Sequence, residues 1–149
     1  MALFAATFFV FAATPTAFGA RQAATQAGVL HAINAARAAH GLQPLRLDAG
    51  LDRAAAVHTA EMLRGNYFAH GDFAGRMTAF HLGGTLGENL AWGSGSAGSP
   101  RSIVQMWLAS PEHRANLLRP GFRRLGLGLG YGAFQGQGSA TVVTADFGS

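Results

Sequence analysis

Apolar side chains in the first half of the chain recur at the spacing of amphipathic helices. Val29, Leu30 and Ile33 form a stripe that predicts a helix over residues 25–40. Thr25 can cap the start of this helix, and Gly41 ends it.

A second helix is predicted from Asp48, a suitable N-cap, to Leu63. Its buried face is expected to consist of Leu51, Ala54, Ala55, His58 and Met62. Residues 66–85 follow Gly65 and show no period, so we expect an irregular loop there.

Farther along the chain, apolar residues alternate with polar or small ones, which is the pattern of strands. A strand over residues 85–93 would place Leu86, Glu88, Leu90 and Trp92 on one face. Residues 123–132 alternate leucine with glycine, so one face of this strand should let a neighbouring element approach closely. After a turn over residues 132–138, residues 139–148 form the last predicted strand.

Two serine–proline pairs mark helix starts between these strands, because serine is a favoured N-cap and proline suits the first helical position. Ser99 begins a helix that runs to Ala109, and Ser110 begins a short one. His113 is then the third residue of the short helix, where the positive helix end favours a neutral imidazole. The order of elements predicts an α+β fold with a small antiparallel sheet flanked by helices.

Composition fits one folded domain. The chain has 149 residues, of which 49% are hydrophobic and 12% are charged, enough for a single core. The net charge is +4 and every basic residue is an arginine, but only residues 114–124 hold several arginines close together. We therefore expect a solvated basic face and no nucleic-acid partner. The absence of cysteine excludes disulfides and thiol chemistry.

The N-terminus predicts the compartment. An apolar run over residues 2–13 is followed by Ala17, Phe18 and Gly19, which fit a small-x-small cleavage site before Ala20. We expect a signal peptide over residues 1–19, a domain over residues 20–149, and a secreted or periplasmic location. The alternative is a retained membrane anchor, for which the run is short.

Two residues are candidates for chemistry on their own. Glu88 falls among apolar neighbours on its strand face, so it either turns to solvent or lies in a buried polar cavity with a partner. His70 follows Tyr67 and Phe68, which are expected to anchor the segment in the core. His70 is then either a loop histidine in water or a side chain that projects into a pocket.

The other histidines favour ordinary roles. His58 lies three residues before Glu61 on a helix, where the two side chains can touch. No spacing of the HExxH type occurs, so no metal motif supports His31, His40 or His81. Ser110 beside His113 could act as a nucleophile, but we expect its hydroxyl to cap the helix, and no G-x-S-x-G elbow is present.

Several motifs together resemble the CAP superfamily, the SCP-like domain of cysteine-rich secretory proteins, insect venom antigens, plant pathogenesis-related proteins and many bacterial exported proteins. The resemblance covers about residues 29–148, and the lack of cysteine resembles the bacterial branch. The motifs are "INAARAAHGLQPLRLDAGLDRAAAVHTAEM", "YFAH", "GENLAWG", "MWLASPEHRANLL", "RRLGLGLG" and "ADFG".

The resemblance implies an α-β-α sandwich around a three-stranded antiparallel sheet. It also implies a central cavity of two histidines and acidic residues, which in some members holds zinc or another divalent cation. Carried over by motif, the cavity residues are His70, Glu88 and His113. Ser110 stands where disulfide-rich members often have a second glutamate. The resemblance thus implies at most an open, weak metal site on His70 and His113, and no required cofactor.

These expectations lead to a secreted, monomeric, non-enzymatic binding module with an extracellular protein, a lipid or a cell-envelope polymer as partner. The alternative is a peptidase-like hydrolase in which a divalent cation activates water and Glu88 is the general base. A third hypothesis is an intracellular or membrane-anchored role, which applies if the N-terminal segment is not cleaved.

Overall fold

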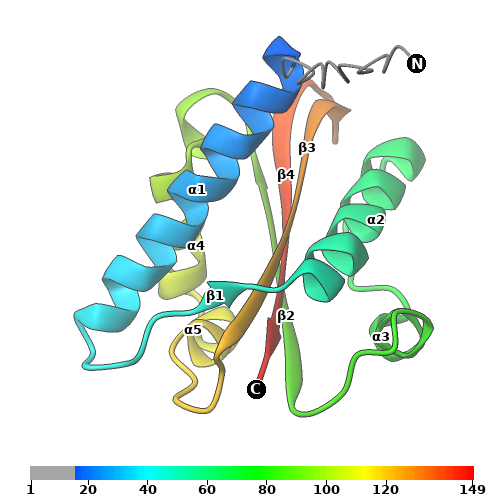
Figure 1. Ribbon diagram of the computed structural model, residues 1–149. Helices are drawn as coiled ribbons and strands as arrows, with labels where there is room; N and C mark the ends of the chain where they lie inside the picture. The colour runs from blue at the N-terminus through cyan, green and yellow to red at the C-terminus, as the bar shows by residue number, and fades with distance from the viewer. Residues whose placement is uncertain (1–15) are drawn as a thin grey trace, which may run out of the picture.

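A four-stranded sheet of order β1-β3-β4-β2 lies between two layers of helices in the computed structural model, which describes residues 16–149 (Figure 1). The strands are β1 (Arg46–Leu47), β2 (Leu86–Gly93), β3 (Arg124–Phe134) and β4 (Gln137–Gly148). The three long strands are antiparallel, as predicted. The two-residue β1 was not predicted, and because it pairs with β3 in parallel it makes the sheet mixed.

Helices α1 and α4 cover one face of the sheet, and α2 and α3 lie on the other (Figure 1). The helices are α1 (Ala17–Ala38), α2 (Ala49–Gly65), α3 (Phe73–Ala79), α4 (Pro100–Ala109) and α5 (Pro111–Leu117), with a 3-10 turn at Gly95–Gly98. The predicted caps of α2 and α4 are confirmed, since Asp48 accepts from the Gly50 and Leu51 amides and Ser99 accepts from the Ser102 amide. The α-β-α layering is confirmed as well.

Helix α1 is longer than predicted. It begins at Ala17 with Thr16 as its cap, so the predicted cleavage site at Ala17–Gly19 forms its first turn. Its first turns are rich in alanine, which favours a helix without producing an apolar stripe. The apolar run at residues 2–13 lies outside the described residues. Within residues 16–149, no helix is both long enough and apolar enough to cross a bilayer.

Helix α3 corrects the prediction of an irregular loop over residues 66–85. The Asp72 side chain caps it by accepting from the Gly75 amide. At seven residues, with Met77 as its buried side chain, the helix is too short to show a period in the sequence.

The glycine face of β3 receives α2, as its sequence predicted. A Cβ atom added to Gly126 would lie 2.1 Å from the backbone carbon of Leu51, and one added to Gly128 would lie 2.1 Å from the carbonyl oxygen of Ala55. The leucines of β3 point the other way, into the main core beneath α1 and α4. The helix backbone of α2 therefore rests directly on the sheet, and this fixes where its side chains meet the candidate site.

Candidate functional site

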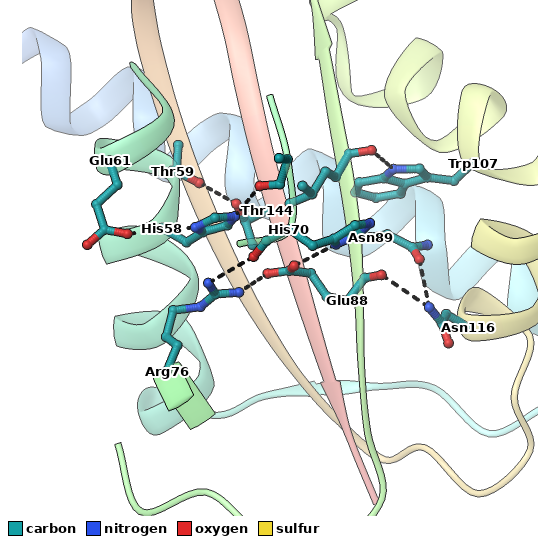
Figure 2. A network of polar contacts seen from close by, with 12 residues as sticks. His58, Thr59, Glu61, His70, Arg76, Glu88, Asn89, Trp107, Asn116 and Thr144 are labelled. Carbon is teal, nitrogen blue, oxygen red and sulfur yellow. Dashed lines mark hydrogen bonds and ion pairs between the residues drawn. The ribbon is translucent and has the colours of Figure 1, made fainter. Parts of the chain in front are cut away.

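The site centres on a buried carboxylate held from two directions. The Glu88 side chain, on β2, is only 3% exposed. Its Oε1 atom lies 2.7 Å from Nδ1 of His70, and its Oε2 atom accepts from Nη2 of Arg76 on α3 (Figure 2). Of the two alternatives for Glu88, the structure therefore shows the buried one, with partners. The partner guanidinium is itself 8% exposed, so this ion pair is shielded from water.

Helix α2 positions the segment that carries His70. Nε2 of His58 lies 3.0 Å from the carbonyl oxygen of Ala69, the residue before His70 (Figure 2). Burial and then the charge of Arg76 lower the pKa of His58, so its imidazole is neutral and donates from Nε2 to this carbonyl. The Nδ1 atom of His58 lies 3.8 Å from a carboxylate oxygen of Glu61, the helical pair that the sequence suggested.

A second carboxyl group faces Glu88 from β4. Asp146 is directly opposite Glu88 in the strand register and is fully buried. Burial, followed by the charge of Glu88, raises the pKa of Asp146 to about 8. Neither of its oxygens has a hydrogen-bond partner among the described residues. At neutral pH the cluster therefore holds one guanidinium, one carboxylate and one protonated carboxyl group.

Amide side chains join β2 to α5. Nδ2 of Asn89 donates to the carbonyl oxygen of His113 at 2.9 Å, and Nδ2 of Asn116 donates to that of Glu88 at 3.1 Å. Nε1 of Trp107 donates to the carbonyl oxygen of Leu90 at 2.9 Å (Figure 2). Because β2 is an edge strand, Asn116 and Trp107 satisfy carbonyl groups of β2 that no neighbouring strand reaches, whereas Asn89 bonds the backbone of α5. They also explain why GEN and SPEHRANLL belong to one site.

His113 and Ser110 line a hollow of about 310 Å³ with Phe68 and Trp107. Burial, then the charge of His70, lowers the pKa of His113, so its imidazole is neutral at pH 7.

The expected capping role of Ser110 is wrong. Its side chain makes no cap hydrogen bond, although its backbone occupies the N-cap position of α5. Ser110 also ends α4, with its amide donating to the carbonyl oxygen of Trp107, so the corner between the two helices sets its conformation. Ser110 lines the hollow, and the end of α5 does not engage its hydroxyl group.

The donor set does not fit a closed metal site. Among residues 16–149, no three histidine, aspartate or glutamate side chains are placed to share a metal ion. Glu88 already has both oxygens engaged, and His70 directs Nδ1 to Glu88. Nε2 of His70 and the ring of His113 would supply two donors, fewer than a structural zinc requires.

The remaining histidines lie outside this site. His31, His40 and His81 are exposed. Both ring nitrogens of His40 are engaged, with Nδ1 2.8 Å from the carbonyl oxygen of Ala36 and Nε2 3.0 Å from Nη2 of Arg114. The ordinary roles expected for these three side chains agree with their placement.

Sequence reasoning missed four residues of the site: Arg76, Asn89, Asn116 and Asp146. Arg76 lay in a segment predicted to be irregular, so no face could be assigned to it. Asp146 had a visible signal, because it follows Thr144 by two residues and so shares a strand face with it. Pairing that strand with the one around Glu88 would have placed two carboxyl groups face to face.

The fold and this site define an SCP-like domain, and comparison with known proteins identifies its family. Residues 30–147 match the model of the cysteine-rich secretory protein family, CAP. The chain therefore belongs to the CAP family.

Its relatives include bacterial and plant proteins. YkwD of Bacillus subtilis is 33% identical over 121 residues, covering 77% of this chain and 46% of YkwD. Pathogenesis-related protein 1 of Arabidopsis thaliana is 42% identical over 78 residues, covering 51% of this chain and 40% of that protein. An extracellular SCP-domain protein from Bacillus anthracis superposes with a TM-score of 0.67 at 26% identity, covering 93% of this chain and 45% of that one. The chain thus spans less than half the length of these relatives.

Proposed function

We propose that this chain is an exported CAP-domain binding module and not a hydrolase. The observation that carries this proposal is the state of Glu88, which is 3% exposed with both oxygens engaged. Export is supported by the apolar N-terminal run and by the extracellular relative from Bacillus anthracis. The binding role extends to an extracellular protein, a lipid or a cell-envelope polymer as partner, with the chain acting as a monomer.

A general base must contact the water whose proton it removes. For Glu88 to do so, a water molecule would have to displace His70 or Arg76 from its oxygens. Displacing Arg76 would leave a buried carboxylate beside Asp146 without its counter-ion, which is costly. Glu88 therefore suits a structural role, in which it ties α3 and the His70 segment to the sheet.

One observation favours the hydrolase alternative in a modified form. The His70 side chain is 55% exposed while its Nδ1 atom contacts Glu88. A histidine oriented by a buried carboxylate is an arrangement that enzymes use for general bases. In this alternative His70, and not Glu88, would accept the proton.

For zinc we propose weak binding by His70 and His113, because Nδ1 of His70 is engaged by Glu88 and residues 16–149 supply no cluster of three ligands. Bound zinc would supply Lewis acidity. The residues of this chain would only hold it, and no step of the proposed binding role depends on it.

The test incubates the purified chain with a mixed peptide library, with and without zinc, and follows cleavage by mass spectrometry. We expect no cleavage above that of a heat-denatured sample. Zinc-dependent cleavage that disappears in Glu88→Gln but persists in the matched Glu61→Gln variant would overturn the binding-module proposal. Glu61 is an exposed glutamate on α2, so its replacement controls for loss of a carboxylate as such.

A further inference from the structure

The hollow beside His113 has features that the polar cluster does not explain. It lies along β2, the edge strand, and is lined by Phe68, Trp92, Met106, Trp107, Ser110 and His113, with the β2 residues at positions 90 and 91 between them. Its volume of about 310 Å³ is at the small end of ligand pockets, which run from about 300 to 1,000 Å³. A single ring or a short chain fills such a space, whereas a sterol or a folded partner does not.

The apolar walls are exposed at the mouth of the hollow and fixed inside it. Phe68 is 42% exposed and Met106 is 39% exposed, so both side chains can contact a ligand. Trp107 is held by its hydrogen bond to the Leu90 carbonyl oxygen, as Figure 2 shows. Phe68 and Trp92 both pack edge-on against Phe134. The walls are therefore formed before any ligand arrives, so binding would order few side chains.

The polar groups of the hollow are Ser110 and His113. The Ser110 hydroxyl makes no cap hydrogen bond and is available to a ligand. Among residues 16–149, no aspartate, glutamate, lysine or arginine lines the hollow. A charged ligand would thus lose its hydration without meeting a permanent opposite charge, which is unfavourable.

We infer that this hollow binds an uncharged amphiphile, namely an apolar ring or short chain with one hydroxyl group that hydrogen-bonds Ser110 and His113. This inference rests on the proposed binding function and names the class of ligand that the function would use.

The chain carries its own reporter for this test. Its two tryptophans, Trp92 and Trp107, both line the hollow, so a bound ligand changes the whole of the tryptophan fluorescence. We would titrate the purified chain with 4-propylbenzyl alcohol, 4-propylbenzoate and propylbenzene, with EDTA present to remove metal ions. We expect saturable binding of the alcohol, at least about tenfold tighter than that of the carboxylate, because the carboxylate would be buried without a cation.

Two variants with a matched control locate the binding. Met106→Glu puts a charge into the wall and should weaken alcohol binding at least about tenfold. Leu47→Glu changes an equally exposed apolar residue that does not line the hollow, and should leave binding unchanged. Ser110→Ala should weaken binding of the alcohol about fivefold, the effect of one hydrogen bond, and leave binding of propylbenzene unchanged.

Three results would overturn the inference: no saturable response in the wild-type chain, equal loss in Met106→Glu and Leu47→Glu, or equal affinity for alcohol and carboxylate. None of them bears on the proposed function, since a module that fails to bind the alcohol and cleaves no peptide is still a binding module with another ligand. Peptide cleavage dependent on Glu88 would instead overturn the proposed function, whatever the fluorescence shows.

Discussion

The sheet turns the leucines of β3, Val143 and Phe147 toward α1 and α4, and turns the glycines of β3, Thr144 and Asp146 toward α2 and α3. The first face is packed mainly by apolar side chains, with the buried Arg37 and Asn89 hydrogen-bonded to backbone carbonyl groups, and burial of apolar area accounts for most of its stability. On the second face the backbone of α2 lies against β3, and two smaller apolar clusters accompany the threonine hydroxyls and the charged cluster.

The contrast teaches that stability alone does not explain the charged cluster on the second face. Replacing a buried ion pair with apolar residues of similar size often leaves a protein as stable or makes it more stable. The Arg76–Glu88 pair and the buried Asp146 thus need another reason, and their proximity to His70 gives one. They hold an exposed imidazole at a fixed place beside the hollow.

The largest expected effect comes from adding a side chain to β3 where the backbone of α2 packs directly against it. In Gly128→Ala, the new methyl group would overlap the Ala55 carbonyl oxygen, which is backbone and cannot rotate away. We expect a loss of about 4 kcal/mol or more in the free energy of unfolding, measured by urea denaturation. Gly138→Ala adds the same methyl group to β4 where no atom lies within 4 Å, and should change stability by less than about 0.5 kcal/mol. Similar losses in both variants would contradict the close packing of α2.

Removing the counter-ion of Glu88 should have the next largest effect. Arg76→Met keeps most of the side-chain volume but leaves a buried carboxylate unpaired, at a cost of about 3 kcal/mol in urea denaturation. Adding Glu88→Gln to this variant removes the orphan charge and should recover at least half of the loss. A double variant no more stable than Arg76→Met would show that the pairing of charges is not what the second face depends on.

The raised pKa of Asp146 predicts that the free energy of unfolding depends on pH. Its pKa is raised to about 8 from 3.8, so the folded chain binds this proton more tightly than the unfolded chain does. Its contribution to stability is complete below about pH 4 and declines as the pH rises toward 8, by on the order of 1 kcal/mol per pH unit. Asp146→Asn should therefore exceed the wild type in stability by an amount that grows between pH 5 and pH 8. Urea denaturation curves that shift with pH in parallel for the two proteins would refute this assignment.

The smallest expected effect comes from the two serines at helix N-cap positions, Ser99 before α4 and Ser110 before α5. Ser99→Ala removes a hydroxyl that accepts from the Ser102 amide and should cost about 1 kcal/mol in thermal or urea denaturation. Ser110→Ala removes one that makes no cap bond, so we expect a change within about 0.5 kcal/mol. Equal costs would mean that Ser110 caps α5 after all.

Hydrophobic patterning predicted the apolar face because each of its elements is long enough to show a period. The stripe around Ile33 and the alternation in β3 are visible to local reasoning, and so is the glycine face that admits α2. The charged cluster joins α3, β2 and β4 through tertiary contacts, so no single segment reveals it. Glu88 and His70 were singled out as anomalies, yet their partner Arg76 lay in a helix too short to be recognised.

The most direct test of the account is a calorimetric zinc titration of the purified chain at pH 7, alongside His70→Ala and His113→Ala. The account holds that Arg76 and His70 occupy the Glu88 carboxylate, leaving two imidazoles for a metal ion. It predicts weak binding that both histidine substitutions abolish. Tight, stoichiometric binding that is lost in Glu88→Gln would contradict it, because the carboxylate would then be a metal ligand. The hydrolase alternative would then become the better hypothesis.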